Sequence, residues 1–323
     1  MAKIAQIGCG HWGKNLTRNF AQLGALACVV EGNAETAQAM SAEYDVPAQS
    51  FEDVLADPNI DAVALATPAE THAALATKAL EAGKHVYVEK PIALSVEDAV
   101  ALVKLAEQRD RRLMVGHLLQ YHPIFMKLRS LVAQGKVGEV LYVYSNRLSL
   151  GKFRTEENVL WSFAPHDLSM LLSVAGEEPS HVNAQGASYF TSGIADWCTA
   201  SLTFPSGVRG HLNVSWMHPF KEQRFVVCGK KGALVFEDSK ADWSEKLAFY
   251  PHTVDVTTPA PLPTKGDVEL INVDHGEPLK AECQHFIDCI DNGTDPRTNG
   301  AEGLAVLRVL SSMEKSLAES LGG

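Results

Sequence analysis

Short apolar runs alternate with helical periodicities over the first 117 residues. The runs of strand length lie at residues 3–7, 26–31, 62–66, 85–88 and 113–116. Between them, apolar residues recur at helical spacing, as at Leu16, Phe20 and Leu23, so that each intervening helix can lay one apolar stripe on a sheet. This alternation predicts a doubly wound parallel sheet, an α/β domain, over residues 1–117.

After residue 117 the pattern changes to β-type runs separated by turn residues, with SG at 206–207 and GKKG at 229–232 as hairpin turns. The expected strands lie at 140–149, 182–190, 199–204, 208–216, 225–228 and 233–237. Helical periodicities fall near 124–131, 168–172, 279–290 and 306–317, and 240–276, which contains PAPLP, is expected to be a long loop. Residues 118–323 are therefore predicted to form an α+β domain with a mostly antiparallel sheet, one face of which needs covering.

The composition is that of an ordinary globular chain. Its 323 residues are 46% hydrophobic and 21% charged, and its net charge of −11 disfavours nucleic acid and anionic membranes as partners. No apolar run approaches the roughly 20 residues that span a bilayer, and the chain opens directly on a strand pattern, so we expect a cytoplasmic protein. The six cysteines are scattered without a CxxC pair, which predicts neither a zinc site nor a disulfide framework.

A glycine-rich motif follows the first expected strand at once and consists of Gly8, Gly10, His11, Trp12 and Gly13. Glycines at these positions permit a tight turn, a backbone that can approach a pyrophosphate, and close packing of helix on strand. Glu31 ends the second expected strand, where a carboxylate can accept hydrogen bonds from ribose hydroxyls. No lysine or arginine follows between residues 32 and 43 to neutralise a 2′-phosphate, so the pattern favours NAD over NADP. The alternative is a plain glycine turn with a surface glutamate.

Further polar residues follow the third and fourth expected strands, at the carboxyl edge where open α/β sheets bind ligands. They are Thr67, Pro68, His72, Glu89 and Lys90. A lysine at this edge, kept out of a helix by the next proline, can bind a sugar hydroxyl, lower its pKa and help to manage its proton. Taken alone, a strand-end lysine is more often not catalytic, and a helix-start histidine is more often a cap.

The second domain offers a histidine and two arginines. Pro165 suits the first helical position, which would place His166 in the first turn, where the helix dipole favours a neutral ring, although Asp167 acts in the opposite direction. Arg147 and Arg154 lie near the end of an expected strand and are candidates for holding phosphate, since guanidinium binds its oxygens bidentately. Such residues are also common as surface caps and solvated charges.

Three residues on the penultimate helix share one face by spacing, namely Glu282, His285 and Cys289. They could be read as metal ligands. We interpret them instead as an ordinary helix face with a Glu–His pair, because no ligand of the right type is evident on another element, and we expect no metal.

Five segments together resemble the Gfo/Idh/MocA family of nicotinamide-dependent oxidoreductases: GCGHWG, ATPAETH, EAGKHVYVEKP, GHLLQYHP and the APHD helix entry. The resemblance covers nearly the whole chain and is most specific from Gly83 to Pro91. It implies a Rossmann domain followed by a domain with an open antiparallel sheet, whose uncovered face commonly packs against another subunit, so a homodimer or homotetramer is expected.

The resemblance also implies site residues. Lys90 and His166 become the catalytic pair. The cofactor NAD is expected to meet Gly8, Gly10, His11, Trp12, Gly13, Glu31, Thr67, Pro68, His72, Glu89 and Lys90. The substrate is expected to meet Lys90, Tyr121, Arg147, Arg154, His166 and Asp167.

Two departures from the family pattern bear on the substrate. Many members have an aspartate at the position of Ser162 and an arginine at that of Gln120, which puts simple inositol or glucose dehydrogenation in doubt. The segments NVLWSFAPHDLSMLL and PRTNGAEGLAVLRVL resemble the nucleotide-sugar branch, most closely UDP-N-acetylglucosamine 3-dehydrogenases. The resemblance then implies oxidation of the sugar 3-hydroxyl to a 3-keto UDP-sugar for amino-sugar synthesis in lipid A or other surface glycans. The alternatives are a dehydrogenase of another UDP-sugar, a free sugar or a cyclitol, and a non-catalytic NAD-binding regulator.

Overall fold

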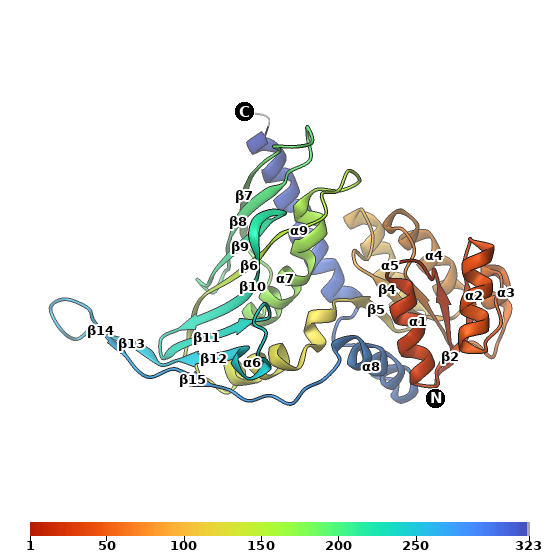
Figure 1. Ribbon diagram of the computed structural model, residues 1–323, viewed down its shortest axis with the longest axis horizontal. Coiled ribbons are helices and arrows are strands. Elements are labelled where there is room, and N and C mark those ends of the chain that lie inside the picture. The colour runs from red at the N-terminus through yellow and green to blue at the C-terminus, as the bar shows by residue number, and fades with distance from the viewer. Residues whose placement is uncertain (322–323) are drawn as a thin grey trace. The chain divides into compact units, whose positions relative to one another are not determined.

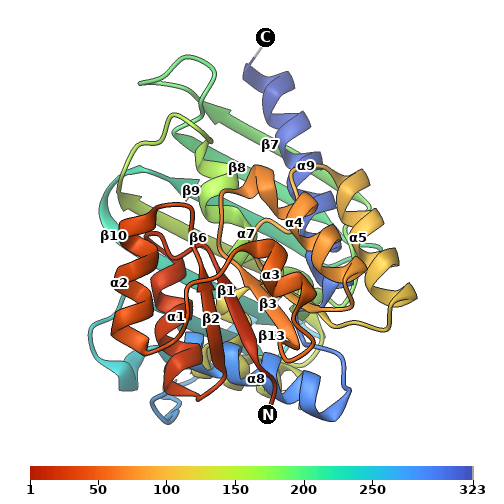
Figure 2. The same cartoon turned by 90° about the vertical axis from the view of Figure 1, so that its right-hand side faces the viewer.

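The computed structural model describes residues 1–321, which form two compact units (Figures 1 and 2). Unit 1 comprises Met1–Tyr121 and Glu277–Leu307, and unit 2 comprises His122–Gly276 and the chain from Arg308 onward. The sequence-based boundary assigned everything after residue 117 to the second domain. The structure instead returns 277–307 to the first unit, because this segment carries an apolar helix stripe that packs there.

Unit 1 is built on a five-stranded parallel sheet in the order β2-β1-β3-β4-β5. Its strands are β1 Ile4–Ile7, β2 Leu26–Val30, β3 Ala62–Leu65, β4 His85–Glu89 and β5 Leu113–Gly116. Each strand is a short apolar run, mostly buried, as expected for a parallel sheet covered on both faces. The doubly wound arrangement predicted from the sequence is confirmed.

The helices of unit 1 are α1 Gly13–Gln22, α2 Ala34–Tyr44, α3 Phe51–Ala56, α4 Ala69–Glu81, α5 Val96–Gln108, the 3₁₀ turn η1 Leu118–Tyr121, and α8 Pro278–Asn292. Helices α1 and α8 pack on each other, and a phenylalanine of each contacts Tyr87 of β4. The ring centroid of Tyr87 lies 6.4 Å from that of Phe20 in α1 and 5.8 Å from that of Phe286 in α8. Apolar strand residues such as Ile4, Ala64 and Met114 belong to one hydrophobic cluster with these side chains of α1 and α8.

Unit 2 contains an eight-stranded sheet in the order β15-β12-β11-β10-β6-β9-β8-β7. The strands are β6 Val140–Leu150, β7 His181–Ala187, β8 Trp197–Thr203, β9 Arg209–Ser215, β10 Met217–Gly229, β11 Gly232–Glu237, β12 Leu247–Tyr250 and β15 Glu269–Leu270. All neighbours are antiparallel except β6 and β9. Both predicted hairpin turns are present, and Gly207 and Gly232 adopt the positive φ angles that they need.

The helices of unit 2 are α6 Pro123–Ala133, α7 Val159–Ala175 and the later part of α9 Gly300–Leu321, with a 3₁₀ turn, η2, at Trp243–Glu245. The expectation of a long loop over 240–276 is wrong. This segment contains β12, β15 and an exposed hairpin of β13 His252–Asp255 and β14 Leu262–Lys265, with the proline-rich stretch at its tip. Four-residue strands leave too little periodicity to be recognised. No helix among residues 1–321 is long and apolar enough to cross a membrane.

Candidate functional site

The glycine motif forms a tight turn between β1 and α1. Gly8 has φ +84°, and a Cβ atom at Gly13 would lie 2.0 Å from the Gly8 carbonyl oxygen, so neither position accepts a side chain. At Gly10, by contrast, a Cβ would meet nothing within 4 Å. The turn therefore needs two of its glycines for its own packing, whereas the third leaves open space at the start of α1, where a helix N-terminus attracts phosphate.

Glu31, directly after β2, is joined to this turn. Its Oε2 accepts a hydrogen bond from the Cys9 backbone N–H at 2.7 Å, and its Oε1 accepts one from Asn33 N–H at 3.1 Å. Asn33 in turn caps α2 through Thr36 N–H at 2.9 Å. The carboxylate is thus fixed at the carboxyl edge of the sheet, beside the glycine turn, where the sequence predicted a ribose-binding group.

Glu89 connects the glycine turn to the end of β4. Its Oε1 accepts a hydrogen bond from the Trp12 indole Nε1 at 2.5 Å and one from the Tyr87 hydroxyl at 3.2 Å. Burial raises the pKa of Glu89, and the Trp12 hydrogen bond and the Lys90 charge oppose that rise. Lys90 follows as a half-buried residue at the same edge, joined to Pro91 by a cis peptide bond.

His72 does not present a ring nitrogen to the open edge. It is 1% exposed, with Nδ1 2.8 Å from the Pro91 carbonyl oxygen and Nε2 2.9 Å from the Thr67 carbonyl oxygen. Burial lowers the pKa of His72, and the hydrogen bonds to the Pro91 and Thr67 carbonyl oxygens oppose that shift. His72 therefore links Pro91, the residue after Lys90, to Thr67 in the turn after β3. The sequence had instead suggested a direct contact between His72 and the cofactor. Pro68 is the N-cap residue of α4, and the Thr67 and Thr71 hydroxyls are 2.6 Å apart.

His166 lies two turns inside α7, not in the first turn of a helix as the sequence suggested. The helix begins at Val159, because the Asn158 side chain accepts hydrogen bonds from the N–H groups of Leu160 and Trp161 at 3.0 and 3.2 Å. Pro165 is an interior residue of α7. The helix dipole therefore gives no reason for a neutral His166, since its effect is confined to the first turn. Ser162 precedes His166 by one helical turn and shares its face.

Arg147 and Asp167 are partners of each other. Arg147 Nε donates to Asp167 Oδ2 at 2.5 Å and its Nη2 donates to Oδ1 at 3.3 Å, while the Ser145 hydroxyl donates to Oδ1 at 2.5 Å. The side chain of Arg147 is 13% exposed and that of Asp167 is 2% exposed. The expectation that these two residues bind substrate is not supported, because each satisfies the other's charge and together they join β6 to α7. Arg154, with a 40% exposed side chain and Glu157 at 2.8 Å, is the more accessible cation.

Tyr121 is likewise a core residue and not a surface ligand. It is 2% exposed, its hydroxyl lies 3.0 Å from Thr298 Oγ1, and its ring faces the guanidinium of Arg297 at 4.9 Å. Arg297 also donates to the backbone oxygen of Gln120 at 2.8 Å. The side chain that the sequence placed at the substrate therefore anchors the returning segment 277–307 to η1.

Two side-chain contacts near these residues were not predicted by any pattern in the sequence. Glu314 of α9 accepts hydrogen bonds from Asn158 Nδ2 at 2.9 Å and Trp161 Nε1 at 3.0 Å, and so fixes the start of α7. At the end of β5, His117 Nδ1 lies 2.6 Å from Glu302 Oε2. In each of these pairs the two residues are more than 150 positions apart in the chain, so no local sequence pattern could reveal the contact.

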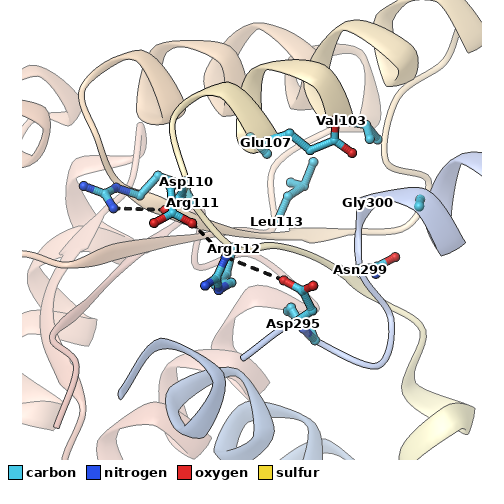
Figure 3. A pocket seen from close by; sticks show the side chains of 12 residues that line it. Val103, Glu107, Asp110, Arg111, Arg112, Leu113, Asp295, Asn299 and Gly300 are labelled. Carbon is cyan, nitrogen blue, oxygen red and sulfur yellow. Dashed lines mark hydrogen bonds and ion pairs between the residues drawn. The ribbon is translucent and has the colours of Figure 1, made fainter. Parts of the chain in front are cut away.

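A separate pocket of about 130 Å³ lies at the opposite, amino edge of the sheet, between the end of α5 and the start of α9 (Figure 3). Arg112 within it bonds the Gly293 carbonyl oxygen at 2.6 Å and lies 3.3 and 3.5 Å from Asp110 and Asp295. Its charge is thus compensated within the protein. The glycine turn, Glu31, Glu89 and Lys90 lie at the other edge, which is the candidate cofactor site.

We predict that Gly13→Ala lowers the free energy of unfolding by about 3 kcal/mol, since the added methyl group overlaps the Gly8 oxygen. Gly10→Ala is the matched control and is expected to unfold like the wild type. Thermal and urea unfolding of both variants measure the difference. Equal stability of the two variants would contradict the turn geometry.

Asp167→Asn should destabilise the protein by about 3–5 kcal/mol, because it leaves the poorly exposed Arg147 guanidinium without its counter-charge. Glu157→Gln, which breaks the exposed pair with Arg154, should cost at most about 1 kcal/mol. Urea denaturation at neutral pH tests both. A loss below 1 kcal/mol for Asp167→Asn would show that the pair is not structural.

Comparison with known proteins identifies the family. Residues 2–117 match the family described as "Oxidoreductase family, NAD-binding Rossmann fold" and residues 125–235 match the GFO/IDH/MocA C-terminal domain. A UDP-N-acetylglucosamine 3-dehydrogenase from Acidithiobacillus ferrooxidans is 32% identical over 305 residues, covering 93% of this chain and 92% of that protein. An inositol 2-dehydrogenase from Rhizobium meliloti is 27% identical over 91% of this chain and 89% of its own.

A solved structure of the Acidithiobacillus ferrooxidans UDP-N-acetylglucosamine 3-dehydrogenase superposes with a TM-score of 0.87 at 28% identity, covering 99% of both chains. The Rossmann sheet, the mostly antiparallel second sheet and the order of elements agree with this fold. The chain therefore belongs to the Gfo/Idh/MocA family and is an NAD-dependent oxidoreductase.

Proposed function

We propose that the chain oxidises the 3-hydroxyl of UDP-N-acetylglucosamine to the 3-keto nucleotide sugar, for amino-sugar synthesis in lipid A or another surface glycan. The observation that carries this proposal is the similarity to a UDP-N-acetylglucosamine 3-dehydrogenase over almost the whole of both chains. A 3-keto sugar is a substrate for amino-group transfer, so an aminotransferase is the class of enzyme that consumes the product.

The residues of unit 1 fit NAD. Gly10 leaves space for a pyrophosphate at the N-terminus of α1, and the fixed carboxylate of Glu31 suits ribose hydroxyls. His11 and Trp12 are exposed in the same turn. When bound, NAD⁺ supplies the two-electron oxidant that accepts the hydride from C3 of the sugar. We assign Thr67, Pro68, Glu89 and Lys90 to this site because they end β3 and β4 at the same edge.

Lys90 and His166 are assigned to the proton of the 3-hydroxyl. The Lys90 ammonium binds the hydroxyl oxygen and stabilises the negative charge that develops there, and the His166 imidazole accepts the hydroxyl proton as the O–H bond breaks. In the reverse direction His166 returns this proton. His72 serves this chemistry indirectly, since it holds the Pro91 carbonyl and so fixes the backbone that carries Lys90.

Two differences from the sequence-based assignment concern the sugar nucleotide. Asp167 bonds Arg147 and Ser145, and Ser162 provides a hydroxyl at the position where the family resemblance implies an aspartate in many members. Because Arg147 is paired in the interior, Arg154 becomes the arginine assigned to the diphosphate.

We also propose that unit 2 forms a homodimer or homotetramer through the face of its sheet that is turned away from α7. Ser145 of β6 bonds Asp167 of α7, so the alternate residues Tyr142 and Tyr144 lie on the opposite face. Their rings stack with centroids 6.3 Å apart, and Tyr142 is 44% exposed. A second copy of the chain is the expected cover, as the family resemblance implies.

An inositol or another sugar is the second candidate substrate, favoured by the inositol 2-dehydrogenase among the relatives. A panel of UDP-sugars, free sugars and cyclitols, followed by NADH absorbance, separates the two. Mass spectrometry of UDP-N-acetylglucosamine incubated with NAD⁺ should show a product lighter by two hydrogens. Turnover of a cyclitol with none for any UDP-sugar would contradict the proposal.

Lys90→Met is predicted to lose at least about 100-fold in kcat and much less in NADH affinity, because the methionine keeps the length of the side chain but removes its charge and proton. Calorimetric titration with NADH measures the affinity for the cofactor, and steady-state assays measure kcat. A variant that keeps more than a tenth of the wild-type rate would remove Lys90 from the mechanism.

A further inference from the structure

Aromatic side chains lie exposed on two loops at one end of the sheet of unit 2. Phe153 belongs to the loop between β6 and α7, and Tyr189 and Phe190 follow β7. Phe153 is 37% exposed and Phe190 is 66% exposed. Large aromatic side chains are more often buried, and several of them together at a surface are a mark of binding sites. We call Phe153, Tyr189 and Phe190 the aromatic patch.

The rings of the patch pack against one another and against a buried tryptophan. Phe153 meets Phe190 edge to face, with ring centroids 5.0 Å apart, and meets Trp216 in the same manner at 6.0 Å. Trp216 follows β9 and is 1% exposed. The Gly151 N–H donates to the Trp216 carbonyl oxygen at 3.1 Å, which holds the start of the first loop beside this tryptophan. Because Phe190 keeps most of its surface open, a flat ring can still stack on it.

A buried carboxylate fixes the second loop. Asp196 accepts hydrogen bonds from the N–H groups of Tyr189 and Phe190 at 2.7 and 3.0 Å. The strand predicted over residues 182–190 ends at Ala187, since beyond it these N–H groups turn to the carboxylate. The patch is thus ordered before any ligand arrives, which lowers the entropic cost of binding.

The second loop also contacts the start of the helix that carries His166. The N–H of Val159, the first residue of α7, donates to the Ala195 carbonyl oxygen at 3.0 Å. From Val159 to His166 the distance along the helix axis is about 10 Å. The loops that carry the patch and the imidazole assigned to the sugar are therefore joined through one helix of unit 2, and ribose and diphosphate are the groups that separate base from sugar in a nucleotide sugar.

Cations flank the patch in the first loop. Lys152 precedes Phe153 and Arg154 follows it. Arg154 is paired with Glu157 at 2.8 Å, but an exposed ion pair of this kind contributes little, so a diphosphate can replace the carboxylate. Aromatic rings for bases, beside cations for phosphates, are the combination with which proteins hold nucleotides. A free sugar or a cyclitol has neither a flat ring nor a negative charge.

We propose that the aromatic patch is the nucleobase subsite for the proposed UDP-sugar substrate. The uracil stacks on Phe190 beside Phe153, Arg154 meets the diphosphate, and the sugar extends along α7 toward His166. This inference rests on the proposed function, because only a nucleotide sugar carries a base.

Two substitutions of Phe190 separate ring stacking from plain apolar contact. Phe190→Leu keeps an apolar side chain and removes the flat ring, whereas Phe190→Tyr keeps the ring. In protein saturated with NADH, we expect Phe190→Leu to bind UDP at least about fivefold more weakly than the wild type and Phe190→Tyr to bind within about twofold, as one base–aromatic stack requires. Calorimetric titration with UDP measures this without any oxidation, and thermal unfolding confirms that both variants are folded.

NADH serves as the control ligand, because its adenine is the other base that the protein binds. Phe190→Leu should bind NADH as the wild type does. A fall in NADH affinity with unchanged UDP affinity would assign the patch to the cofactor. Equal affinity of the wild type and both variants for UDP would remove the base from the patch. Either result overturns the proposal.

Trp216 reports on the patch from beneath the surface. Its indole N–H has no hydrogen-bond partner among residues 1–321, so the NMR resonance of this group responds to its aromatic neighbours. The resonance, assigned with Trp216→Phe, should shift when UDP is added to the wild type. The same resonance should shift less in Phe190→Leu, and a resonance that UDP leaves unchanged in the wild type would contradict binding at the patch.

The subsite and the proposed reaction fail separately. A wild type that binds UDP through Phe190 and does not oxidise UDP-N-acetylglucosamine would support the subsite and overturn only the reaction. Sedimentation of Phe190→Leu tests whether a second copy of the chain covers the patch instead. A variant that dissociates but keeps its UDP affinity would assign the patch to a subunit contact and overturn the proposal.

Discussion

The close approach of Gly13 to the Gly8 carbonyl oxygen is the constraint on which the first unit depends. With only 2.0 Å available for a Cβ at Gly13, the chain must pass from β1 into α1 without side chains at either position. That passage brings the helix start to the carboxyl edge of the sheet. Because the strands are parallel, the residues that follow β2, β3 and β4 end at the same edge, and Glu31, Thr67 and Lys90 are placed there by topology alone.

The cofactor edge is held together by side chains that do not themselves belong to a recognition motif. Glu89 accepts hydrogen bonds from Trp12 and Tyr87, and the two ring nitrogens of His72 lie at hydrogen-bond distance from the carbonyl oxygens of Pro91 and Thr67. These contacts link the turns after β1, β3 and β4. A lysine side chain is flexible, so a fixed backbone beneath Lys90 is what allows its ammonium group to be reproducibly placed.

The sequence was sufficient for features that depend on local patterns. The parallel strands, the glycine turn and the hairpins at Gly207 and Gly232 follow from apolar spacing and from the backbone freedom of glycine. The sequence could not predict contacts between residues that are distant in the chain. The hydroxyl of the buried Tyr121 lies 3.0 Å from that of Thr298, 177 positions later, and Arg147 is paired with Asp167 of another element. The start of α7 was misplaced because Pro165 resembled a first helical residue, whereas the helix is capped by Asn158, almost two turns earlier. Glu282 followed the helix stripe, and only its burial showed that it has no histidine partner.

We propose that NAD⁺ removes hydrogen from C3 of UDP-N-acetylglucosamine at this site. UDP-N-acetylglucosamine deuterated at C3 tests this proposal most directly, with the nicotinamide product and the sugar analysed separately by mass spectrometry. The account predicts that the deuterium is found in the reduced nicotinamide and that the sugar becomes an unlabelled 3-ketone. Deuterium retained in an oxidised sugar, with unlabelled NADH formed, would place the reaction at another carbon and contradict the account.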